Sequence, residues 1–199
     1  MTANVIVVVE RVFDHPRLDV FRAWTDPEEL TEWRGSPGWH VEAGSAAADL
    51  RLGGKHRHVK VRDDDPTVRV ITDATFIEYF APDVFVARQL ISGDYGIDPH
   101  VPLELRVEFS VEGRDSTRVR IVQGPFDPAV AQYHAAAWEE EMQRCADFLD
   151  GDDDAEGGEG EADRVAQFTA FRQRMNQRIL AEPNQVVRRF FALDTQTYQ

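Results

Sequence analysis

The sequence predicts an α+β domain in which a curved antiparallel sheet wraps around one long C-terminal helix. Apolar and polar residues alternate along residues 103–112, a pattern typical of an antiparallel strand with one buried and one solvent-facing side. Residues 127–149 instead place Trp138, Met142 and Cys145 at helical spacing, which predicts an amphipathic helix. A sheet with one apolar face has to be covered, and this helix is the only long element available to cover it.

Two short helices are expected between the first strand, residues 5–13, and the rest of the sheet. Residues 17–24 carry apolar side chains at helical spacing. Asp26 and Pro27 are typical of the N-cap and first position of a second helix, which we expect to end near Gly35. Alternation and intervening turn residues predict the remaining strands at residues 40–43, 55–61, 68–79, 84–91, 103–112 and 117–123.

A strongly acidic segment divides the chain. Residues 150–163 contain only Asp, Glu, Gly and Ala, with eight acidic and no basic side chains. Such a segment has no side chain to bury and its like charges repel one another, so we expect an extended linker. It separates a domain of residues 1–149 from a helical tail of residues 164–199, which carries six basic and two acidic side chains.

Composition excludes several classes of partner and compartment. The 199 residues include 22 basic and 36 acidic side chains, and the resulting net charge of −14 argues against binding to nucleic acid. No apolar run approaches the roughly 18–20 residues that a membrane span needs, and no signal-peptide pattern opens the chain. Because the single cysteine, Cys145, excludes an internal disulfide, we expect a cytoplasmic protein. The sequence does not set the oligomeric state.

Several segments together resemble a known superfamily. They are residues 20–30 (VFRAWTDPEEL) with Trp33 following, 49–55 (DLRLGGK), 116–119 (STRV), 122–126 (VQGPF) and 134–138 (HAAAW). In this order they make residues 1–149 similar to the helix-grip START-like (SRPBCC) superfamily, within the group of heat-shock-protein-90 ATPase activator homologues. The resemblance implies a cavity for a small hydrophobic ligand, or a protein-interaction module of the co-chaperone kind. The group shares no catalytic motif, so the resemblance assigns no catalytic residue.

The tail carries a second resemblance. Residues 168–175 (FTAFRQRM) and 187–198 (VRRFFALDTQTY) look like parts of the opening helices of carboxymuconolactone-decarboxylase-like proteins. Members of that group act through a Cys-x-x-Cys pair or a nearby His in later helices, which this chain does not reach. The resemblance implies that the tail is either the front part of a longer fusion or an incomplete second domain without its chemistry. Alternatively, the basic tail docks on the acidic domain or pairs with another copy.

Five residues are the candidates for ligand binding. Trp33 and Trp39 flank a loop of residues 35–38, where an aromatic side chain can line the mouth of a cavity. Phe109 lies on the apolar face of its strand. His134 lies one helical turn before Trp138, where it can donate a hydrogen bond or act as a general acid or base. For each of these residues, ordinary packing in the core is the alternative interpretation.

Other polar residues are assigned to solvent. His56 and His58 lie two apart on a strand and share one side, which would suit zinc if a third ligand were present. Because no third ligand is placed by spacing and Lys60 and its basic neighbours oppose a cation, we expect a solvated strand face. We likewise expect residues 139–141, three consecutive glutamates, on the wet face of the last helix. No cofactor and no metal are expected.

Three classes of function remain open. We expect a binding protein for a small hydrophobic molecule rather than an enzyme. One alternative is a co-chaperone-like module with a protein partner, acting through its surface. The other is a cyclase- or lyase-type enzyme, which would need His134 or a carboxylate facing the cavity within hydrogen-bonding distance of the ligand.

Overall fold

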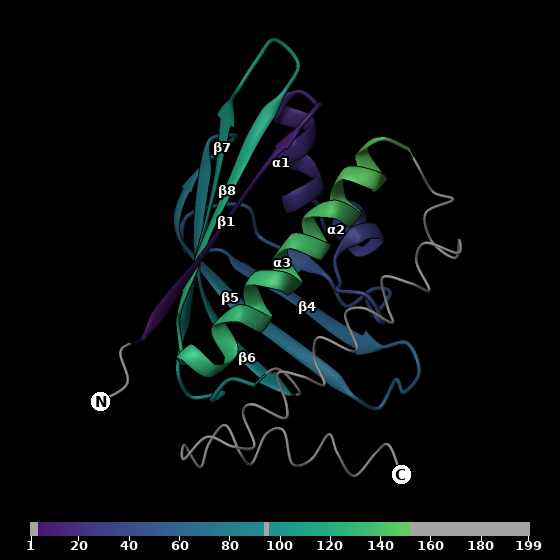
Figure 1. The fold of residues 1–199 in the computed structure, drawn as a ribbon, viewed down its shortest axis with the longest axis vertical. Helices are drawn as coiled ribbons and strands as arrows, with labels where there is room; N and C mark the ends of the chain where they lie inside the picture. Colours follow the sequence, from purple (N-terminus) through teal and green to yellow (C-terminus); the bar gives the residue numbers. More distant parts are fainter. Residues whose placement is uncertain (1–3, 94–95, 152–199) are drawn as a thin grey trace.

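An eight-stranded antiparallel sheet curves around one long helix (Figure 1). The computed structural model describes residues 4–93 and 96–151 of the chain. The strands are ordered β1-β8-β7-β6-β5-β4-β2, and β3 pairs with β4 beside this path. Their bounds are β1 (Val5–Phe13), β2 (Trp39–Val41), β3 (Ala47–Ala48), β4 (Lys55–Arg62), β5 (Arg69–Phe80), β6 (Val84–Gly93), β7 (Leu103–Val111) and β8 (Thr117–Phe126).

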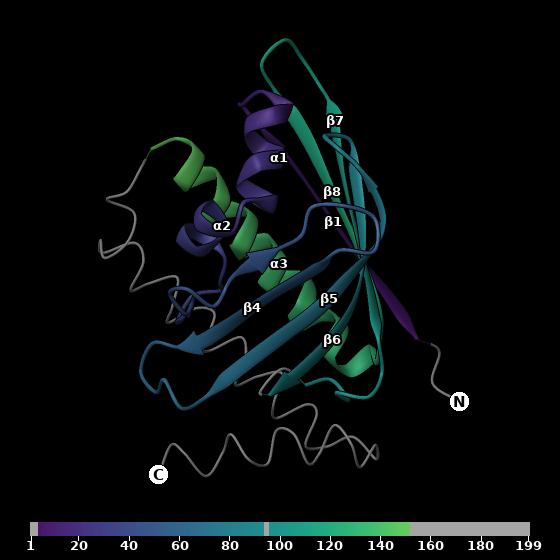
Figure 2. The same ribbon diagram turned by 180° about the vertical axis from the view of Figure 1, so that it is seen from behind.

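Three helices lie on one side of this sheet (Figures 1 and 2). They are α1 (Arg17–Thr25), α2 (Pro27–Trp33) and α3 (Pro128–Leu149). The side chain of Asp26 accepts hydrogen bonds from the backbone N–H groups of Glu28 and Glu29, which caps α2 as predicted. Asp127 caps α3 in the same way through the N–H of Ala129, at 2.9 Å.

The predicted α+β class and helix-grip architecture are confirmed, and the differences are shifted strand ends and one additional short strand. β8 continues to Phe126 because this residue pairs with Val5 of β1. Gly93, paired with Val70, likewise extends β6. The two-residue strand β3 was not predicted because two alanines carry no alternation. The expected tail, residues 164–199, lies outside the described residues.

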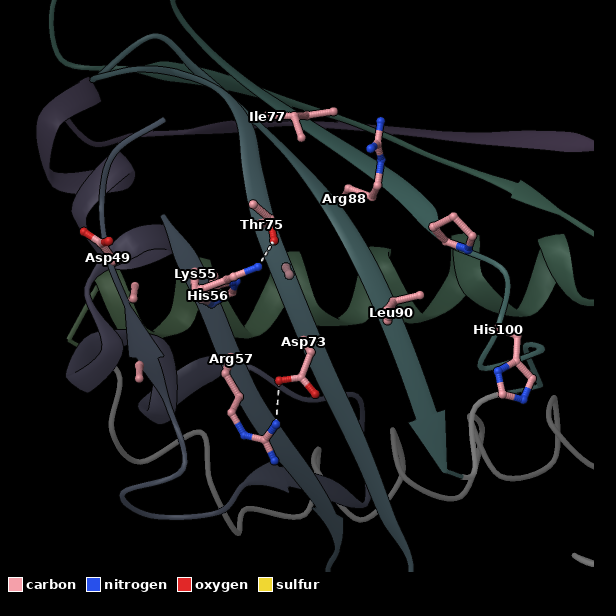
Figure 3. A pocket seen from close by; sticks show the side chains of 14 residues that line it. Asp49, Lys55, His56, Arg57, Asp73, Thr75, Ile77, Arg88, Leu90 and His100 are labelled. Carbon is pink, nitrogen blue, oxygen red and sulfur yellow. Dashed lines mark hydrogen bonds and ion pairs between the residues drawn. The ribbon is translucent and has the colours of Figure 1, made fainter. Parts of the chain in front are cut away.

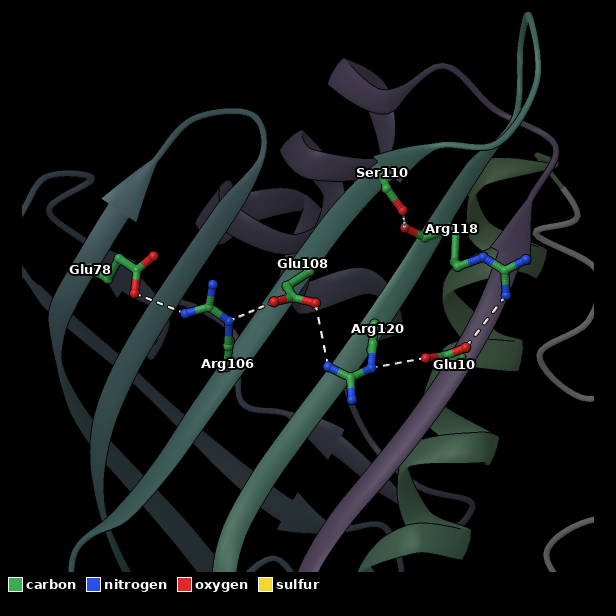
Figure 4. Close-up of polar contacts among 7 residues, drawn as sticks. All are labelled: Glu10, Glu78, Arg106, Glu108, Ser110, Arg118 and Arg120. Atoms are coloured by element: carbon green, nitrogen blue, oxygen red, sulfur yellow. Dashed lines mark hydrogen bonds and ion pairs between the residues drawn. The ribbon is translucent and has the colours of Figure 1, made fainter.

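The outward face of β1, β7 and β8 is covered by ion pairs rather than by another layer (Figure 4). Arg106 contacts Glu78 at 2.8 Å and Glu108 at 2.6 Å, and Arg120 contacts Glu10 at 2.9 Å and Glu108 at 3.5 Å. Three of these four pairs join different strands and Arg106–Glu108 lies within β7; all are partly exposed, so each contributes about 0–1 kcal/mol. Their main effect is to fix the register in which the strands pair, because a slip of one residue would turn these charged side chains toward the core.

The loop between α2 and β2 holds α3 in place. The guanidinium group of Arg144 donates to the carbonyl oxygens of Trp39 at 3.2 Å and Gly35 at 3.4 Å. Gly35 has a φ of 152°, and a Cβ atom there would lie 2.4 Å from the Trp39 carbonyl oxygen. Gly38 also has a positive φ, 82°, but a Cβ atom there would meet nothing within 4 Å.

These two glycines provide a matched test of the loop. Gly38→Ala adds only backbone strain and should lower the free energy of unfolding by about 1 kcal/mol. Gly35→Ala adds a steric clash with the backbone and should lower it by about 3 kcal/mol or more. Urea unfolding followed by circular dichroism measures both values. Equal losses for the two variants would contradict the close approach at Gly35.

Candidate functional site

A row of polar side chains crosses the inner face of the sheet beneath α3. His58 on β4 faces Thr72 on β5, and Gln89 on β6 and Gln123 on β8 continue the row on the same face. All four side chains are at most 3% exposed. We call these four residues the polar band. Because buried polar groups are costly unless they are hydrogen-bonded, the partners of each member decide what the band can do.

The end of the polar band formed by Gln89 and Gln123 is hydrogen-bonded to α3. The Nε2 group of Gln123 donates to Oε1 of Gln89 at 2.7 Å. The indole N–H of Trp138 on α3 donates to Oε1 of Gln123, also at 2.7 Å. Trp138 therefore joins the helix to the sheet through a hydrogen bond as well as through packing.

Three buried charges lie next to the polar band. Glu141 of α3 contacts Lys60 of β4 at 2.8 Å and Arg34, which ends α2, at 2.7 Å. We call these three residues the buried ion cluster. The guanidinium carbon of Arg34 also lies 4.0 Å from the ring centroid of Trp138, in cation–π geometry. The expectation that residues 139–141 all face solvent is therefore wrong for Glu141, because helical periodicity turns it toward β4.

Burial and pairing oppose each other in this cluster. Burial lowers the pKa of Lys60 and so does the charge of Arg34, while Glu141 acts in the opposite direction. For Glu141 burial alone would raise the pKa, but the charges of Arg34 and Lys60 outweigh it and the net pKa is lowered. The carboxylate therefore stays ionised, and it is what keeps two cations in the interior.

The histidines of β4 lie on the inner face, beside Lys60. Their ring centroids are 5.3 Å apart, and His56 stacks on Phe76. Burial and the charge of Arg34 lower the pKa of His56 to about 4. The pKa of His58 also lies well below its usual value, lowered by burial first and then by His56, Arg34 and Lys60. Both rings are neutral near pH 7, and neither ring nitrogen of His58 has a hydrogen-bond partner among the described residues.

The expectation of a solvated strand face is wrong for His58, which α3 and the neighbouring strands bury. A strand pattern shows only that the two rings share a side, and the sheet topology decides that this side is the inner one. Among residues 4–93 and 96–151, no three His, Cys, Asp or Glu side chains come together as a metal site requires.

His134 lies on the inward face of α3, one turn before Trp138. Its ring stacks on Phe126 with centroids 4.4 Å apart. Burial and the charge of Lys60 lower its pKa to about 3, against the opposing effect of Glu141. His134 is therefore uncharged at neutral pH.

Three of the predicted ligand-binding residues meet around Trp24. The centroid of its ring lies 4.9 Å from that of Trp33, 5.9 Å from that of Trp138 and 6.1 Å from that of Phe109. Of the other two candidates, Trp39 lies on β2 and His134 lies in the first half of α3. All five are at most 7% exposed: Trp33, Trp39, Phe109, His134 and Trp138.

Neither the polar band nor the buried ion cluster was predicted from the sequence. The sequence does contain a signal for these residues. Gln89 and Gln123 lie at inward-facing positions of strands in which apolar and polar residues alternate. Lys60 follows His56 and His58 at the same two-residue spacing. A polar residue at an apolar position of an alternating strand is the feature that would have found them.

A groove of about 1010 Å³ lies on the opposite, outer face of the sheet (Figure 3). Two of its basic side chains have partners within the groove: Lys55 donates to Thr75 at 2.7 Å, and Arg57 contacts Asp73 at 2.5 Å. The interior instead contains a buried imidazole with unused donor and acceptor capacity. We therefore take the interior as the candidate site. The groove is also lined by Ala47, Ala48, Asp49, His56, Ala74, Ile77, Arg88, Leu90, His100 and Pro102.

A curved antiparallel sheet that encloses a long C-terminal helix, with two short helices after the first strand, defines a helix-grip protein of the START-like class. The family model of the Activator of Hsp90 ATPase homolog 1-like proteins matches residues 14–151. The chain belongs to this family, whose fold is in general a ligand-binding fold. No curated protein matches the sequence significantly.

Solved structures share the fold at low sequence identity. Protein CV1439 from Chromobacterium violaceum is 16% identical, covers 72% of this chain and 95% of its own, and has a TM-score of 0.63. The AHSA1 protein from Silicibacter pomeroyi is 19% identical over 74% of this chain and 99% of its own, with a TM-score of 0.64. DynU16, a putative protein in the dynemicin biosynthetic locus, is 17% identical over 74% of this chain and 48% of its own, with a TM-score of 0.56.

Within the described part of the chain, no helix combines the length and apolar character needed to cross a membrane. This agrees with the absence of a long apolar run in the sequence.

Removing the shared carboxylate should strongly destabilise the domain. Glu141→Gln leaves two buried cations without the carboxylate they share, so the free energy of unfolding should fall by about 3–5 kcal/mol. Glu139→Gln, on the exposed side of the same helix, should change it by no more than about 0.5 kcal/mol. Chemical unfolding at pH 7 measures both. A similar small effect for the two variants would rule out a structural role for the cluster.

Stability should also fall as pH is lowered from 6.5 toward 4. Folded pKa values of about 4 for His56 and about 3 for His134 lie below the value of 6.5 for a free histidine, so the unfolded chain binds more protons in this range. Each such histidine adds a slope of about 1.4 kcal/mol per pH unit. His134→Gln should reduce the slope between pH 5.5 and 4 by that amount. Parallel stability curves for the two proteins would contradict the burial of a neutral His134.

Proposed function

We propose that the domain binds a small, largely hydrophobic molecule between the sheet and α3. The observation that carries this proposal is His58, a fully buried imidazole in the polar band with no hydrogen-bond partner for either ring nitrogen among the described residues. Leaving a buried polar group unsatisfied costs about 1–3 kcal/mol. A ligand atom that hydrogen-bonds to His58 removes this cost.

The surroundings of His58 support a ligand with an apolar body and one polar group. On the strand opposite it, the inward side chains Thr72 and Ala74 are short. The aromatic side chains Phe109, Trp33 and Trp138 supply apolar contact area around Trp24. Small-molecule sites are typically apolar with a few placed polar groups, and this interior has that composition. We place Trp39 and His134 at the ends of the same interior.

Native and denaturing mass spectrometry of the purified full-length protein test the proposal directly. We expect the native mass to exceed the sequence mass by that of a small molecule, which denaturation releases. If the protein purifies without a ligand, the neutral dye Nile red should bind and gain fluorescence. An empty protein that also fails to bind the dye would overturn the proposal.

A pair of phenylalanine variants tests the location of binding. Phe109→Leu changes the wall of the proposed site, so it should weaken Nile red binding at least fivefold. Phe80→Leu removes a ring that is 64% exposed at the end of β5 and should leave binding unchanged. Equal effects of the two variants would indicate that the dye binds outside the interior.

A further inference from the structure

The inner face of β4 carries a line of nitrogen-bearing side chains on the side of the sheet that α3 covers. His56, His58, Lys60 and Arg62 occupy alternate positions of this strand and therefore share the face that Lys60 turns toward Glu141. The two histidine rings are 5.3 Å apart, and Lys60 comes next along the strand. The side of the interior formed by β4 is therefore rich in hydrogen-bond donors.

The buried ion cluster contains two cations and one carboxylate, so positive charge is in excess there. Arg34 and Lys60 are both cationic and share the carboxylate of Glu141, which is the one acid that the described part of α3 buries. Burial lowers the pKa of His58 most, and the neighbouring cations Arg34 and Lys60 lower it as well, while His56 is itself neutral near pH 7. Charges that oppose a proton at this position favour an anion there.

We propose that the interior site selects ligands with a carboxylate or an equivalent monoanionic group, which accepts hydrogen bonds from His58 and Lys60. This inference rests on the proposed function and adds the chemical class of the ligand. A neutral imidazole donates one N–H, and an ammonium group donates up to three. The carboxylate uses the unsatisfied donor of His58 and adds a second negative charge beside the two cations, while the apolar body of the ligand contacts the aromatic side chains.

The outer face of the same strand does not offer an equivalent site. Lys55 and Arg57 alternate with the histidines and point into the groove, where Thr75 and Asp73 accept from them (Figure 3). An anion there would compete with Asp73 and with water. Lys55 is therefore a matched control for Lys60, because the two lysines lie on opposite faces of one strand.

Three probes with the same ring system separate charge from apolar contact. They are 2-naphthoate, 2-naphthamide and 2-naphthylmethylammonium, titrated into the full-length protein at pH 7 by calorimetry. We expect 2-naphthoate to bind at least tenfold more tightly than 2-naphthamide, and the ammonium probe to bind most weakly. If the amide binds as tightly as the carboxylate, or the ammonium probe binds most tightly, the inference is wrong.

Two variants then assign the selectivity to residues. Lys60→Met should weaken 2-naphthoate at least tenfold and 2-naphthamide much less, while Lys55→Met leaves both affinities unchanged. His58→Phe, which keeps a ring of similar size, should also reduce the preference for the carboxylate and carries the test if Lys60→Met does not fold. A carboxylate preference that survives both inner variants would overturn the assignment.

These measurements distinguish a wrong ligand class from the absence of any ligand-binding site. Binding of the neutral probe as tightly as the carboxylate removes the inference and keeps the proposed function. If none of the three probes binds, the molecule released in denaturing mass spectrometry decides: an acid supports the inference, and a neutral or cationic compound overturns it. If no probe binds, nothing is released and Nile red does not bind either, the proposed function fails together with the inference; if Nile red alone binds, the proposed function is kept and the inference is overturned.

Discussion

The carboxylate of Glu141 is the interaction on which the arrangement of this domain depends. It joins α3 to β4 through Lys60 and to the end of α2 through Arg34, at 2.8 and 2.7 Å. Because charges are costly to bury, this cluster is compatible with only a narrow range of positions of α3 over the sheet. The cation–π contact of Arg34 with Trp138 and the hydrogen bond from Trp138 to Gln123 extend the same constraint across the sheet to β8. The helix is thus held by directional polar contacts as well as by apolar packing.

The two faces of the sheet use polar residues in opposite ways. On the outer face, arginines and glutamates pair across strands while remaining half-exposed, and water limits what each pair contributes. On the inner face, the polar band and the buried ion cluster lie in a low-dielectric environment, where each contact matters more and each missing partner costs more. His58 is the member whose partners the described residues do not supply, which makes it the chemical centre of the proposed site.

The fold could be predicted from the sequence to a much greater extent than the site. Alternation in residues 103–112, the cap at Asp26 and the apolar stripe containing Trp138 are all local features of the sequence, and the structure confirms all of them. The inner face of β4 could not be assigned this way, because basic residues occupy both of its faces and only the pairing with β5 and the position of α3 determine which face is buried. Glu141 was missed for a related reason: in a run of three glutamates, composition suggests solvent, whereas helical phase turns the third one inward.

The central claim is that a ligand contacts His58 inside the domain. Long-range ¹H–¹⁵N correlation spectra of the histidine rings, recorded with and without 2-naphthoate, measure this contact most directly. The account predicts that the ring nitrogens of His58 shift on binding, and that those of His100, on the outer groove, do not. Shifts confined to His100, or no shift at His58 under saturating probe, would contradict an interior site.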